Sequence, residues 1–90
     1  MSIPVQQLRN LGPRSAGWLA QINILTADDL RSIGAAAAYR ELIIQGIVKP
    51  HRMLLYALAG ALEDVDCLRM DRAHKRELEA AAGIDHLQHS

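Results

Sequence analysis

The stretch MLLYALAGAL, residues 53–62, is apolar apart from one glycine. Its leucines and alanines favour a helix over about 50–64, and they leave that helix almost without a polar face. A helix of this kind is normally buried at the centre of a small domain. Ten residues are too few to cross a bilayer, which takes about 20. The stretch therefore predicts a buried central helix, contributed by residues 51–63.

Signals that begin and end helices occur on both sides of this stretch. Pro13 suits a first helical turn, and Thr26 and Asp71 suit N-cap positions. Gly34 and Gly83 favour helix ends. No run alternates β-branched and aromatic residues as a strand does. We therefore expect an all-α fold, a compact bundle of five or six short helices over about 4–10, 13–21, 27–33, 35–45, 50–64 and 72–82.

The length and composition fit one domain. The chain has 90 residues, of which 50% are hydrophobic, so it can bury a modest core but not two. We expect a single domain over residues 1–83 and a flexible tail over 84–90. The N-terminus lacks the basic start and apolar stretch of a signal peptide, so we expect a cytoplasmic protein.

The charges are balanced overall but are unevenly distributed. Ten basic and ten acidic side chains give a net charge of zero, which argues against strong non-specific binding of nucleic acid. Residues 1–52 nevertheless carry six basic and three acidic side chains, and residues 53–90 carry four basic and seven acidic ones. This asymmetry either steers a polyanion toward the first half or reflects the ordinary mixture of charges on helix surfaces.

Few side chains suggest chemistry. His86 and His89 have a spacing that a metal could use, but no third ligand lies near them in the sequence. Cys67, the single cysteine, excludes an intrachain disulfide and is expected at the edge of the core. Asp64 and Asp66 follow the central helix and are expected in a solvated loop. Since no phosphate-binding, nucleophile-elbow or Cys-x-x-Cys motif occurs, we expect no enzyme activity, no metal and no cofactor.

A pattern of the form Leu-x-x-(Leu/Ile)-Gly-x-x-x-Ala occurs twice, at residues 8–16 and 30–38. The first copy resembles the helix-hairpin-helix motif, in which a glycine turn leads into a helix N-terminus followed by a basic residue. Free N–H groups at a helix start attract a phosphate, and an arginine adds attraction. The alternative is an ordinary turn with a solvated arginine. The candidate phosphate-binding residues are Gly12, Arg14, Ser15 and Arg9.

The chain also resembles a known family over roughly residues 5–78. The most distinctive stretches are LGPRS at 11–15 and LYAL at 55–58, accompanied by Trp18-Leu19 and Ala61-Leu62. They are similar to the C-terminal domain of the TfoX (Sxy) family of competence regulators. The resemblance implies a small helical domain with a helix-hairpin-helix or SAM-like arrangement, an association with the regulation of DNA-uptake genes, and no catalytic residues.

Three features depart from that family. Asn23 occupies a position where the family often has glycine, and asparagine can replace glycine in a left-handed turn. Cys67 lies near a position where the family often has tryptophan, so we expect different packing there. The N-terminal domain of the full-length regulators is absent from this sequence, and we expect a stand-alone copy whose link to competence needs its own test.

Two functions follow from these observations. The first is a non-enzymatic regulatory or protein-interaction domain related to regulators of competence, with a protein partner or self-association. The alternative is weak, sequence-independent nucleic-acid binding through the turn Leu11–Ala16. Neither function requires a membrane or a small-molecule substrate.

Overall fold

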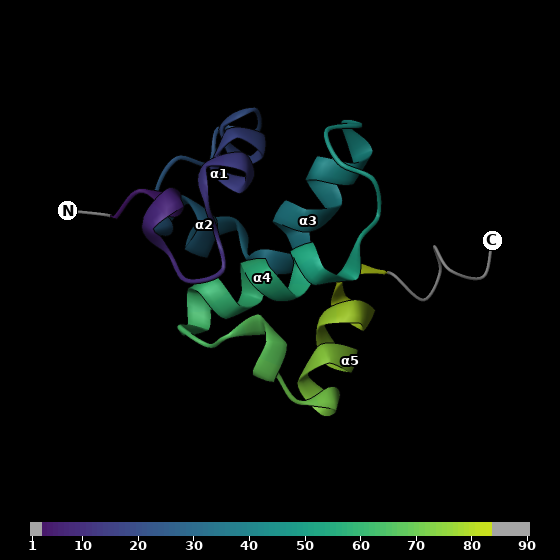
Figure 1. Ribbon diagram of the computed structural model, residues 1–90. Helices are drawn as coiled ribbons and strands as arrows, with labels where there is room; N and C mark the ends of the chain where they lie inside the picture. Colours follow the sequence, from purple (N-terminus) through teal and green to yellow (C-terminus); the bar gives the residue numbers. More distant parts are fainter. Residues whose placement is uncertain (1–2, 84–90) are drawn as a thin grey trace.

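Helices begin in this chain where a capping side chain, a proline or a glycine precedes them. The computed structural model describes residues 3–83 (Figure 1). Its elements are the 3-10 helix η1 (Val5–Gln7), α1 (Pro13–Ala20), α2 (Ala27–Ile33), α3 (Ala35–Ile44), α4 (Arg52–Glu63), the 3-10 helix η2 (Cys67–Arg69) and α5 (Arg72–Ala82).

The predicted all-α class is confirmed over the described residues. The α-helix boundaries agree with the sequence prediction to within about two residues, whereas the short first helix is a 3-10 turn and η2 was not predicted. Extended pairing within 3–83 is limited to an isolated antiparallel bridge between Pro4 and Thr26. None of the helices in this range has the length and hydropathy required to cross a bilayer. The predicted tail over 84–90 lies outside the described residues.

The start of α2 shows how local capping sets a helix boundary. The Thr26 hydroxyl accepts a hydrogen bond from the backbone N–H of Asp29 at 3.2 Å. The Asp29 carboxylate in turn accepts from the backbone N–H groups of Leu25 and Thr26, at 3.0 and 3.1 Å. These backbone hydrogen bonds favour the ionised carboxylate and lower the pKa of Asp29. Together they form a capping box at the N-cap position that the sequence predicts.

Helix α4 is the central element, as the sequence predicts. In Figure 1 it crosses the middle of the molecule, with α1, α2 and α3 on one side and α5 on the other. Leu55 and Leu58 are fully buried, and α4 packs against α2, α3, α5 and η2. The helix is not enclosed all round, because Met53 and Ala57 on one side and Leu62 on another are only partly buried. The apolar helix therefore supplies both the core and part of the surface.

The two copies of the repeated pattern diverge in three dimensions. Gly12 and Gly34 are both N-cap residues, of α1 and α3. Gly12 has an extended backbone with φ −134°, whereas Gly34 has φ +88°, which favours glycine. The chain therefore enters the two helices differently. Leu11 is buried, whereas Ile33, at the matching position of the second copy, is 40% exposed.

Candidate functional site

The N-terminus of α1 brings three of the four predicted phosphate-binding residues together. Gly12 is the N-cap, Pro13 is the first helical residue, and no side chain caps the helix. Arg14 and Ser15 follow in the first turn, where backbone N–H groups lack helical acceptors. Pro13 has no N–H, so it removes one donor. Arg14 is exposed and makes no ion pair within residues 3–83, so its guanidinium is available to an anion.

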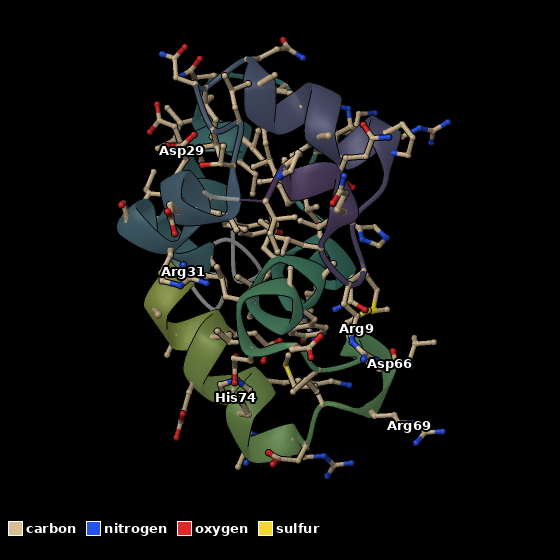
Figure 2. The ribbon with its side chains drawn as sticks, turned by 90° about the vertical axis from the view of Figure 1, so that its left-hand side faces the viewer. Arg9, Asp29, Arg31, Asp66, Arg69 and His74 are labelled. Atoms are coloured by element: carbon tan, nitrogen blue, oxygen red, sulfur yellow. The ribbon has the colours of Figure 1, made fainter. Side chains whose placement is uncertain are left out.

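Arg9, the fourth predicted residue, has a different environment. Its Nε lies 3.1 Å from Oδ1 of Asp64, in the loop that follows α4. Figure 2 shows Arg9 on the same side of the molecule as Asp66, which belongs to that loop. The element before the turn is the three-residue helix η1 rather than an α-helix. The helix-hairpin-helix assignment of this segment therefore stays a prediction. Arg9 links the loop before α1 to the loop after α4.

Asn10 also links these two loops, a role that its position in the sequence does not indicate. Its backbone is left-handed, with φ 72°. Its side-chain Nδ2 donates to the carbonyl of Val65 at 2.8 Å, and its Oδ1 accepts from the backbone N–H of Cys67 at 3.3 Å. The loop that leads into α1 is thus anchored on the loop that follows α4. This anchoring sets the position of Gly12 and Arg14 relative to the central helix.

An open pocket of about 570 Å³ lies beside α1, next to the predicted phosphate-binding turn. Its walls come from α1, the connector between α3 and α4, the first half of α4, and η2. The lining is mainly apolar, and Lys49 and His51 are its basic side chains. The lining residues are Ser15, Trp18, Ile47, Val48, Lys49, His51, Met53, Leu54, Ala57 and Cys67.

Two features position the walls of the pocket. Ser15 and Trp18 are three residues apart on α1 and so lie on one face of that helix. The connector is fixed by the backbone N–H of His51, which donates to the buried Tyr39 hydroxyl at 2.8 Å. Burial raises the pKa of Tyr39, so this hydroxyl keeps its proton at neutral pH. The sequence did not predict the pocket, because its walls come from four separate segments.

The titratable groups with shifted pKa values support the structure elsewhere. Nε2 of His74 lies 2.7 Å from Oε2 of Glu63, and this hydrogen bond raises the pKa of His74. Burial, with a hydrogen bond to Glu79, raises the pKa of Tyr56. Within 3–83 no three histidine, cysteine or acidic side chains are grouped to hold a metal ion. His86 and His89 lie outside the described residues.

Known proteins similar to this chain agree with the fold. The family model of the TfoX C-terminal domain matches residues 1–82. No curated protein matches the chain. The crystal structure of an uncharacterized protein from Listeria monocytogenes, in a triclinic form, is similar with a TM-score of 0.75 and 28% sequence identity, over 84% of this chain and 85% of that one. Because the family match extends over nearly the whole chain, this protein belongs to the TfoX C-terminal domain family.

Proposed function

We propose that this domain is a non-enzymatic protein-interaction module that acts in the regulation of DNA-uptake genes. The observation that carries the proposal is the apolar pocket beside Trp18. Apolar hollows bordered by polar groups mark interaction sites on many proteins, and tryptophan is enriched among residues that dominate binding energy. The family membership supplies the regulatory context.

The side chains near the pocket favour binding over catalysis. Ser15 and His51 both line the pocket, but the known hydrogen bond at His51 is made by its backbone and supports the connector. A nucleophile needs a base within hydrogen-bond reach and a third group that orients that base. The described contacts contain no such chain of three side chains at the pocket. Binding through shape and apolar area is the role that these residues support.

An Ala57→Glu variant tests this role, because Ala57 lines the pocket and is only partly buried. Ala80→Glu is the matched control, since Ala80 is exposed on α5 and lines no pocket described here. We expect Ala57→Glu to lower the expression of DNA-uptake genes and the retention of protein partners on the immobilised domain. Ala80→Glu should behave as wild type. Equal behaviour of the two variants would contradict the proposal.

A second candidate function is weak, sequence-independent binding of nucleic-acid phosphate by Gly12, Arg14 and Ser15. It is favoured by the uncapped start of α1 and by the unpaired Arg14 beside it. Each phosphate contacted should contribute about −0.9 to the slope of log affinity against log salt. Arg14→Glu should remove binding to duplex DNA at low salt, and Arg40→Glu, an exposed charge reversal on α3, should weaken it much less. Equal losses of DNA affinity in the two variants would show that net charge, rather than the turn at Gly12, determines binding.

A further inference from the structure

The walls of the pocket beside Trp18 carry no carboxylate. They belong to α1, to the connector 45–51, to residues 52–57 of α4 and to η2, and none of these segments contains an aspartate or a glutamate. The acid that directly precedes η2, Asp66, is engaged as its N-cap and accepts from the N–H of Leu68 at 2.9 Å. Four basic side chains belong to the same segments, in a chain with no net charge. The pocket therefore attracts an anionic partner.

Two of these basic side chains are free and belong to different walls. Arg14 precedes Trp18 by four residues on α1, which places the two about 40° apart around the helix and on the same side of it. Lys49 lines the pocket from the connector. Both are exposed, and neither makes an ion pair within the described part of the chain. Arg52 already forms an ion pair with α5, and Arg69 lines a different pocket.

The backbone that presents Lys49 is anchored on both sides. Before it, the N–H of Ile47 donates to the carbonyl of Leu42 at 2.9 Å. After it, the N–H of His51 donates to the Tyr39 hydroxyl at 2.8 Å. A partner that meets a cation on an anchored backbone loses less conformational entropy than one that must order a loop. Lys49 is thus placed at the pocket before any partner binds.

The hollow that these cations border is apolar. Trp18, Met53 and Ala57 are only partly buried, so their side chains present apolar surface in the pocket of about 570 Å³. A large apolar side chain gains free energy by covering this surface, whereas a nucleic-acid phosphate has no apolar surface to offer. A small organic acid with a single carboxylate meets one cation. A peptide with carboxylates on both sides of an apolar residue meets both cations and fills the hollow.

We propose that the pocket binds an acidic peptide segment of a partner protein. A large apolar side chain of that segment enters the hollow, and carboxylates on either side of it meet Arg14 and Lys49. The proposal rests on the proposed function, because it names the chemistry of the partner that the same pocket takes. It commits the pocket to a peptide rather than to nucleic acid.

Selection from a phage library of random peptides, with the purified chain immobilised, tests the proposal. The selected peptides should carry aspartate or glutamate on both sides of leucine, isoleucine or phenylalanine. A selected peptide without tryptophan is then titrated into the chain and followed by the fluorescence of Trp18, the only tryptophan. Its affinity should fall at least fivefold when the salt concentration is raised from about 0.1 to 1 M, because salt screens exposed charges.

Four variants separate charge from shape in this titration. Lys49→Glu and Arg14→Glu should each weaken the peptide at least tenfold in Kd. Arg40→Glu is the matched control, because Arg40 is exposed on α3 and does not line this pocket, and its Kd should stay within twofold of wild type. Ala57→Gln adds bulk and polarity to the hollow without a charge, and it should weaken the peptide at least fivefold. Circular dichroism should show that all four variants remain helical.

The outcomes separate this proposal from the proposed function. Selected peptides without an excess of acid, an affinity that neither Lys49→Glu nor Arg14→Glu changes, or binding of duplex DNA with no acidic peptide selected overturns the acidic partner. If Ala57→Glu still lowers partner retention and gene expression relative to Ala80→Glu, the pocket nevertheless retains its interaction role. If no acidic peptide is selected and Ala57→Glu has no such effect, both proposals fail.

Discussion

At the scale of single residues, Gly60 is a glycine whose missing side chain lets two other segments approach α4 closely. A Cβ atom added at Gly60 would collide with the carbonyl oxygen of Val65 and with Nδ2 of Asn10. Alanine is intrinsically better in a helix by about 1 kcal/mol. We expect the collision to outweigh that gain, so that Gly60→Ala lowers the free energy of unfolding by about 1–3 kcal/mol. Urea unfolding followed by circular dichroism measures the change.

Gly17 provides the opposite case within the same protein. It lies on the exposed face of α1, and a Cβ there would meet nothing within 4 Å. Gly17→Ala should therefore raise the free energy of unfolding by about 0.5–1 kcal/mol, through helix propensity alone. Stabilisation by Gly60→Ala would show that the approach of Asn10 and Val65 to α4 is looser than described. Destabilisation by Gly17→Ala would show that the surface around Gly17 on α1 is less open than described.

Residues whose role is set by near neighbours were predictable from the sequence. Thr26 and Asp71 cap helices through N–H groups three residues ahead, and Gly83 ends α5 in a left-handed conformation as expected. Asn23 has the predicted positive φ of 63°. Gly60 was not predictable, because its neighbour Asn10 lies fifty positions away in the chain and meets it only in the folded state. Local signals define caps, whereas close approaches depend on tertiary packing.

At the scale of elements, α4 and α5 are joined by a titratable pair. His74 on α5 (Figure 2) bonds to Glu63 at the end of α4, and Glu77 lies 3.7 Å from its Nδ1. The Glu63 hydrogen bond raises the pKa of His74 in the folded state. The resulting stabilisation is fully present below the unfolded pKa of about 6.5 and is lost as the pH rises through the higher folded value. Partial exposure limits it to about 0.2–1 kcal/mol.

A His74→Gln variant isolates this contribution. Glutamine retains a hydrogen-bonding side chain but cannot become charged. The difference in free energy of unfolding between wild type and His74→Gln should be larger at pH 5.5 than at pH 8.5, with wild type favoured at the lower pH. Taking the difference removes the contributions of other titrating groups that the two proteins share. A difference that is the same at both pH values would assign His74 a purely steric role.

Contacts between elements were less predictable than the elements themselves. Asp71 and Lys75 are four residues apart, a spacing that suits an i,i+4 ion pair along α5. The Asp71 carboxylate forms the predicted cap, accepting from the N–H of His74 at 2.8 Å, and Lys75 finds a different partner. The ammonium of Lys75 lies 5.1 Å from the centre of the Tyr56 ring on α4, within reach of a cation–π interaction. The i,i+4 rule applies to an isolated helix. In the folded domain, Tyr56 on α4 lies within reach of Lys75 as well.

At the scale of the whole molecule, the sequence predicted the core better than the surface. The apolar stretch 53–62 predicts a buried helix because no orientation of α4 could avoid burying apolar side chains. The pocket could not be predicted in this way, since Trp18, Lys49 and Cys67 come from distant segments. Its position depends on where α4 runs, on the Tyr39–His51 hydrogen bond and on the Asn10 anchor. The candidate phosphate-binding turn stays a prediction: Gly12, Arg14 and Ser15 lie together because they are near neighbours in the chain, whereas Arg9 contacts Asp64.

The two roles of α4 can be separated by mutation. Leu58 is fully buried and lines no described pocket, so Leu58→Ala removes core packing alone. We expect it to lower the free energy of unfolding by about 2–5 kcal/mol, a large part of the stability of a small domain. Leu68→Ala, at an exposed position, should cost less than about 0.5 kcal/mol. Urea unfolding compares them, and similar losses from both substitutions would mean that α4 is not the packing centre on which the pocket depends.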